Sequence, residues 1–138
     1  METPKILVAG SSQKSVALVR EAIKPLGYQL VTAQAMSVAL FLAQKNLPDI
    51  IISDLKMLDG DGIGFLNELK LDDELAKIPF LFLVDKPTDE ATEISAITRG
   101  ARLICLNSMA KVEMLALLEP LLQERLAAKG KRPEHTPE

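Results

Sequence analysis

The sequence predicts an α/β fold in which helices cover both faces of a doubly wound, five-stranded parallel sheet. Short apolar runs alternate with amphipathic stretches five times along the 138 residues. The runs are continuous rather than alternating in polarity, which is typical of strands buried on both faces. Hydrophobic residues make up 48% of the chain and charged residues 25%, a balance typical of one folded globular domain.

The predicted strands are the apolar runs, each bounded by glycine, proline or a polar segment. In chain order they are residues 5–9, 28–33, 50–53, 80–84 and 103–106. Strands that alternate with helices form βαβ units, which build a parallel sheet with helices on both sides. Five such units in this length favour a flavodoxin-like sheet with the strand order 2-1-3-4-5.

The helix boundaries follow from capping residues and helix breakers. Ser12 or a neighbouring residue caps the first helix, and Gly27 stops it. The second helix spans residues 36–46 and is broken by Pro48. The third helix, residues 63–71, follows a loop rich in aspartate and glycine.

The last two helices complete the predicted domain. Thr88 or Asp89 caps the fourth helix, which ends near Gly100. The fifth helix spans about residues 110–128, and Pro120 inside it should kink it or split it in two. We therefore expect one domain over residues 4–128, followed by a polar tail or linker over residues 129–138.

Composition excludes several classes of function. The net charge is −3, from 16 basic and 19 acidic residues, so no basic patch for nucleic acid is expected. No apolar run approaches the roughly 20 residues that span a bilayer, so no membrane segment is expected. Cys105 is the only cysteine and His135 the only histidine, which argues against disulfides, histidine metal sites and Ser/His catalysis. We expect a cytoplasmic protein that is not an enzyme.

Ligands of doubly wound sheets bind beyond the carboxyl ends of the strands. The segments KILVAGSS, PDIIISDLKMLDGDG, IPFLFLV and GARLICLNS run up to and past these ends. In order and spacing they resemble the landmarks of the receiver domains of response regulators, the CheY-like domains, over about residues 4–126. The resemblance places Asp54 at the position of the phospho-acceptor.

A working receiver needs further residues around its acceptor, and the resemblance implies where they fall. Two acidic residues that hold Mg²⁺ fall on Gly10 and Ser11. The hydroxyl that binds the phosphoryl group falls on Val84, and the lysine that pairs with it falls on Asn107. Each lost group removes on the order of 2–4 kcal/mol of transition-state stabilisation. We therefore expect a pseudo-receiver, degenerate at its phosphorylation site, that uses neither Mg²⁺ nor another cofactor.

Two alternative functions stay open. The first is a conventional receiver that is phosphorylated on Asp54 despite a poor site. The second is a small-ligand or anion sensor that uses the former phosphorylation crevice, with Ser12 and Lys14 as contacts. Main-chain N–H groups at the start of a helix suit an anion, although a plain helix cap is the simpler interpretation of this loop.

Three other acidic residues lie near the predicted crevice. Asp85 follows the fourth strand, and together with Asp54 it would form a rebuilt metal site. Asp59 and Asp61 lie in the loop before Gly62, where the simpler interpretation is that they form a turn.

The expected partner is another protein, either a histidine kinase or a downstream output protein, with a homodimer as a further option. The resemblance implies a contact surface on the fourth helix, the fifth strand and the fifth helix. Its candidate residues are Ile94, Ile97, Ile104, Leu122 and Leu126. On the second helix, Val38 and Phe41 form another apolar spot if they are exposed; the alternative is a rotated helix with Phe41 buried.

Overall fold

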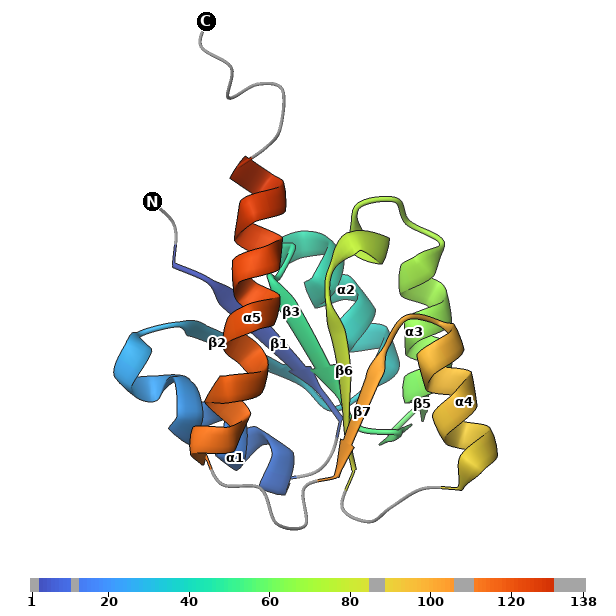
Figure 1. Ribbon diagram of the computed structural model, residues 1–138. Coiled ribbons are helices and arrows are strands. Elements are labelled where there is room, and N and C mark those ends of the chain that lie inside the picture. Colours follow the sequence, from blue (N-terminus) through green and yellow to red (C-terminus); the bar gives the residue numbers. More distant parts are fainter. Residues whose placement is uncertain (1–2, 11–12, 85–88, 106–110, 131–138) are drawn as a thin grey trace, which may run out of the picture.

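The computed structural model describes residues 3–10, 13–84, 89–105 and 111–130. Its main element is a five-stranded sheet with the spatial order β2-β1-β3-β6-β7, and every neighbouring pair is parallel (Figure 1). The strands are β1 (Lys5–Ala9), β2 (Gln29–Ala33), β3 (Ile50–Ser53), β6 (Phe80–Val84) and β7 (Arg102–Cys105). The predicted parallel α/β architecture is confirmed.

Helices cover both faces of this sheet (Figure 1). On one face lie α1 (Gln13–Ile23) and α5 (Lys111–Gly130), which pack against each other. On the other face lie α2 (Met36–Asn46), α3 (Gly62–Lys70) and α4 (Glu90–Thr98). Two short 3₁₀ helices lie in the connections between elements: η1 (Lys24–Leu26) between α1 and β2, and η2 (Leu75–Lys77) between α3 and β6.

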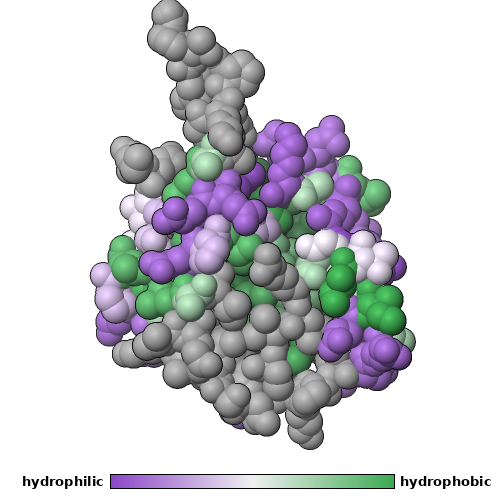
Figure 2. Space-filling model, in the orientation of Figure 1, coloured by the Kyte–Doolittle hydropathy of each residue, from purple (hydrophilic) through white to green (hydrophobic). Residues whose placement is uncertain are grey.

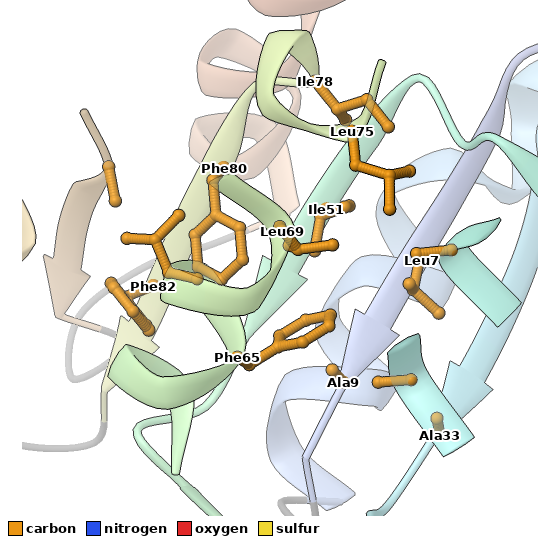
Figure 3. Packing of buried hydrophobic residues seen from close by; sticks show 14 of the residues in the cluster. Leu7, Ala9, Ala33, Ile51, Phe65, Leu69, Leu75, Ile78, Phe80 and Phe82 are labelled. Atoms are coloured by element: carbon orange, nitrogen blue, oxygen red, sulfur yellow. The ribbon is translucent and has the colours of Figure 1, made fainter. Parts of the chain in front are cut away.

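The two faces of the sheet are both buried, which explains why its strands are apolar throughout. Successive side chains of a strand point to opposite faces. In β3, Ile51 therefore packs beneath α2 and α3, whereas Ile50 and Ile52 pack beneath α1 and α5. Figure 3 shows the first of these layers, where Phe65 of α3 lies over Phe80 with ring centroids 5.7 Å apart.

Several helix boundaries have the predicted residues. Gly27 has φ +72° and ends η1 by donating its N–H to the Lys24 carbonyl, which is why glycine suits this position. The Asp89 carboxylate accepts the N–H of Thr92 at 2.8 Å and caps α4. Thr88, the other predicted cap, lies outside the described residues.

Two elements differ from the sequence-based expectation. The loop after β3 contains a small antiparallel pair, β4 (Lys56–Met57) with β5 (Gly60–Asp61), that was not predicted. Pro120 does not split the last helix, which runs unbroken from Lys111 to Gly130. Leu118 and Leu122 are 0% and 3% exposed on either side of the proline, so burial holds together a helix that propensity alone would interrupt.

No helix in the described part of the chain is both long enough and apolar enough to span a bilayer.

Candidate functional site

The carboxyl ends of three neighbouring strands meet at one edge of the sheet, at the bottom of Figure 1. The register pairs Ala9 of β1 with Ser53 of β3, and Ser53 with Phe82 of β6. The next residues of the first two strands, Gly10 and Asp54, therefore lie side by side. The fold thus brings the predicted acceptor and one predicted degenerate position together.

Asp54 is held at this edge by its main chain and its neighbours. Its N–H donates to the carbonyl of Ala9 at 2.8 Å, and the Ser53 hydroxyl donates to the Asp54 carbonyl at 2.7 Å. The residue is only 9% exposed, and Ser53 is fully buried. The carboxylate thus stands at the rim of the core rather than in open solvent.

Gly10 leaves the space that the Asp54 side chain occupies. A Cβ atom at position 10 would lie 2.5 Å from Cγ of Asp54 and 2.6 Å from its Cβ, far inside van der Waals contact. Gly10 also has φ +136°, which side chains of L-residues rarely permit. Its N–H donates to the Ala33 carbonyl at 2.7 Å, which fixes this conformation. The Asp54 side chain therefore fills the volume that an acidic residue at position 10 would need.

The loop after β3 returns tightly against the same edge. Gly62 donates its N–H to the Leu55 carbonyl at 2.8 Å. A Cβ at Gly62 would meet the Asp54 carbonyl and would lie 2.5 Å from Cε1 of Phe82. Only a residue without a side chain fits here, so the loop closes directly onto the main chain of Asp54.

The fourth strand of the sheet, β6, contributes Val84 to this edge. Val84 is 7% exposed and carries two methyl groups where the family resemblance expects a hydroxyl. It therefore has no donor for an oxygen bound next to Asp54.

Some predicted site residues lie elsewhere or outside the described residues. Ser11, Ser12, Asp85 and Asn107 are among the residues that the structure does not describe. Lys14 is exposed in the first turn of α1. The anion contact and the rebuilt metal site both involve undescribed residues, so they remain predictions.

Whether Mg²⁺ could bind at Asp54 depends on the oxygen atoms around this carboxylate. This ion takes oxygen ligands in octahedral geometry, from one or two carboxylates together with water or phosphate. Around Asp54, however, Gly10, Gly62 and Val84 bring no oxygen from a side chain. In the described ranges, no three His, Cys, Asp or Glu side chains are grouped so that they would hold a metal ion.

Asp59 has a structural role that the sequence analysis missed. It lies between β4 and β5, and its Oδ2 accepts the Ser37 hydroxyl at 2.7 Å while its Oδ1 accepts the N–H of Met36. The hydroxyl of Ser37, together with the N–H groups of Met36 and Ser37, holds the pKa of the Asp59 carboxyl below its usual value. The residue before α2 is Ala35, which has no capping side chain. The absence of a capping side chain at position 35 was the sequence signal that a residue elsewhere in the chain caps α2.

Asp61, for which the simpler interpretation was a turn, caps the following helix. Its Oδ1 accepts the N–H of Gly64 at 2.6 Å, at the start of α3. Asp59 and Asp61 are therefore both occupied in holding this loop between two helix starts.

The predicted partner surface is only partly exposed. Ile94 and Ile97 are 56% and 60% exposed on α4, and Leu126 is 44% exposed near the end of α5. Figure 2 shows strongly hydrophobic side chains at the surface over α4, next to hydrophilic ones. The side chain of Ile104, in β7, lies outside the described set.

The prediction for Leu122 is wrong, because this residue is 3% exposed and packs from the inner side of α5 into the core. The inner side of α5 is formed by residues three and four apart, Leu118, Leu121, Leu122 and Arg125. Leu126 lies just outside that stripe.

Val38 and Phe41 are exposed on α2, so the alternative of a rotated helix with Phe41 buried is wrong. Val38 is 46% exposed and Phe41 is 58% exposed, while Ala39 and Ala43 face the sheet. Small residues on the inner side let α2 pack closely, and the larger apolar side chains are left outside.

Comparisons with known proteins identify the family. A protein-family model described as the response regulator receiver domain matches residues 6–119. The KDP operon transcriptional regulatory protein KdpE of Escherichia coli is 29% identical over 96 residues, which are 70% of this chain and 41% of KdpE. The polar-differentiation response regulator DivK of Brucella ovis is 28% identical over 79 residues, which are 57% of this chain and 64% of DivK. The aligned part is thus less than two thirds of either relative.

Solved structures share the fold. The chemotaxis response regulator CheY4 of Vibrio cholerae superposes with a TM-score of 0.75 at 24% identity, over 87% of this chain and 99% of CheY4. The signal receiver domain of an HD domain-containing protein from Pseudomonas fluorescens gives a TM-score of 0.81 at 21% identity, over 96% of both chains.

Proposed function

The chain belongs to the response regulator receiver domain family, and on that premise we propose that it works in two-component signalling as a phosphorylation-independent protein-interaction module. It is a pseudo-receiver in this proposal: Asp54 marks the position of the phospho-acceptor but does not serve as one. The role is binding rather than catalysis, and no Mg²⁺ takes part. The expected partners are a histidine kinase, an output protein or a second copy.

The observation that carries the proposal is the shared volume of Gly10 and Asp54. A phosphoryl group and an aspartate repel each other, and receivers offset that repulsion with a bound metal ion and a lysine side chain. Position 10 brings no carboxylate for the metal, and a Cβ placed there would lie 2.5 Å from Cγ of Asp54. A substitution at position 10 alone would therefore not supply a metal-binding side chain, because the Asp54 side chain would also have to move.

Val84 supports the same proposal. In a phosphorylated receiver, a hydroxyl at this position binds the phosphoryl oxygen and draws the adjoining loop inward. The buried Val84 has no such donor, so a phosphoryl group on Asp54 would gain no contact from β6. The surface is then expected to be the same whether or not the cell supplies phosphate.

The domain and its compartment follow from the same premise. We take residues 4–128 as the domain and residues 129–138 as a tail or linker, and we place the protein in the cytoplasm, where response regulators meet their kinases.

Phosphorylation of Asp54 is the direct test. The protein is incubated with acetyl phosphate and Mg²⁺ and analysed by intact mass, and parallel samples with beryllofluoride are followed by ¹H–¹⁵N NMR. We expect no phosphoryl adduct and no shift of the Asp54 neighbourhood, with a receiver that carries the complete site as the positive control. An adduct that disappears in Asp54→Asn would instead establish the conventional phospho-acceptor.

A further inference from the structure

Helix α2 presents a stripe that combines two apolar side chains with a cation. Val38, Phe41 and Lys45 are exposed and lie three and four residues apart, so they share one side of the helix. The ammonium group of Lys45 lies 5.8 Å from the centre of the Phe41 ring, which places the charge beside the apolar pair. The helix contains no acidic residue.

Helix α4 presents a stripe of the opposite charge. Glu90, Ile94 and Ile97 are exposed and lie four and three residues apart, again on one side of the helix. Glu93 is exposed next to this stripe, and the helix contains no basic residue. The two isoleucines are 56% and 60% exposed, as open as Val38 and Phe41.

The two stripes match when the helices run antiparallel. Lys45 then lies opposite Glu90, Phe41 opposite Ile94 and Val38 opposite Ile97. On both helices the charged residue is four positions from the first apolar residue and seven from the second, or about 6 Å and about 10 Å along the axis. Every residue of one stripe therefore meets a residue of complementary character.

A single copy has no means of making this contact within itself. Helix α2 contacts β1 and β2 at one end of the sheet, and α4 contacts β7 at the other end (Figure 1). Both helices lie on the same face, with α3 between them. The stripes are thus on opposite flanks of the molecule, where they can meet only between two molecules.

We propose that the protein associates with a second copy of itself head to tail, with α2 of one copy antiparallel against α4 of the next. This inference rests on the proposed function and names one of its partners. Charge selects this arrangement: pairing α4 with α4 leaves Glu90 and Glu93 of both copies without a cation, and pairing α2 with α2 leaves Lys45 without an acid. Such a contact uses two different surfaces, so each copy can bind two others, and assemblies larger than a dimer form as the concentration rises.

The contact is small, which sets how it must be measured. A patch of about three residues from each side falls in the range of weak, transient interfaces. Association is therefore followed by sedimentation velocity over a series of concentrations, and it decreases with added salt because the ion pair lies at the surface.

Two variants that each block one flank provide the decisive test. Phe41→Asp removes the α2 stripe and leaves α4 intact, whereas Ile94→Asp removes the α4 stripe and leaves α2 intact. We expect each variant to be monomeric alone, and an equimolar mixture to form a dimer that grows no further. Leu71→Asp is the matched control, because Leu71 is 81% exposed and lies outside both stripes.

The charged pair is tested by exchange. Lys45→Glu and Glu90→Lys should each weaken association by roughly fivefold, and the double variant should restore it. Lys24→Glu is the control for a change in net charge away from the contact.

Three results would overturn the inference. One is self-association that Phe41→Asp leaves unchanged, which shows that the α2 stripe takes no part in it. Another is a mixture of the two blocked variants that stays monomeric. The third is a wild-type chain that stays monomeric at every concentration, in which case the two stripes serve other proteins. If acetyl phosphate instead modifies Asp54 while the mixture still dimerises, the proposed function fails and the contact stands.

Discussion

At the scale of single residues, the Asp54 side chain occupies the space that a side chain at position 10 would need. The glycine is needed twice, once for its φ of +136° and once because its missing Cβ makes room for the Asp54 side chain. At Gly27 the glycine is needed only for its φ of +72°, since a Cβ at this position would meet no atom within 4 Å. A comparison of the two glycines therefore separates the cost of a positive φ from the cost of overlap with the Asp54 side chain.

Substitution of these glycines by alanine should have unequal costs. Gly27→Ala should lower the free energy of unfolding by about 1 kcal/mol, the cost of a left-handed alanine. Gly10→Ala should lower it by about 2–4 kcal/mol, because overlap with Asp54 is added to that strain. Urea denaturation followed by circular dichroism measures both. Equal losses in the two variants would mean that the Asp54 side chain moves aside freely.

At the scale of elements, Asp59 joins the loop after β3 to the start of α2. Its hydrogen bonds to Ser37 and Met36 span more than 20 residues of sequence and stand in for the cap that Ala35 does not provide. Asp89 makes the corresponding bond to Thr92 locally. The hydroxyl of Thr92, together with its N–H, likewise holds the pKa of the Asp89 carboxyl below its usual value. One helix thus begins with a local cap and the other with a cap from a distant loop.

The Asp59 contact should give a pH-dependent stability. The pKa of Asp59 is lowered in the folded state from an ordinary 3.8, so its contribution is complete above that pH and is lost as the pH falls through the lower, folded value. Asp59→Asn should therefore be less stable than the wild type at neutral pH, and the difference should shrink below about pH 4. Asp73→Asn, at an exposed aspartate, is the control. A stability difference that does not vary between pH 3 and pH 7 would contradict this account.

At the scale of the whole molecule, phenylalanines lie both in the core beside the sheet and on the surface. Phe82 is fully buried and packs edge-on against Phe80 with ring centroids 4.9 Å apart, whereas Phe41 is 58% exposed on α2. The same residue type therefore serves stability in one place and is free for binding in the other.

Alanine substitutions should separate these two roles. Phe82→Ala should lower the free energy of unfolding by about 3–5 kcal/mol, because it leaves a cavity between α3 and the sheet. Phe41→Ala should change it by less than about 1 kcal/mol and should reduce self-association instead. Denaturation and sedimentation on the same samples test both statements. A large loss of stability in Phe41→Ala would place this ring in the fold rather than on a contact surface.

Patterns that extend over a few residues were predicted well from the sequence. Continuous apolar runs such as residues 80–84 predicted buried strands, and Gly27 and Asp89 predicted the end of one helix and the start of another. The effect of Pro120 was predicted less well, because the propensity rule describes an isolated helix and α5 is held against the sheet by Leu118 and Leu122. Local rules fail where distant packing contributes more free energy than they do.

The sequence by itself determined which side chains are present at the edge of the sheet: an aspartate at 54, a glycine at 10 and a valine at 84. Only the tertiary structure decided that Asp54 fills the space beside Gly10, that Leu122 is buried, and that the stripes of α2 and α4 lie on opposite flanks. The physical reason is that residue type and periodicity are properties of short segments. Exposure and contact, by contrast, depend on how segments far apart in the chain pack against one sheet.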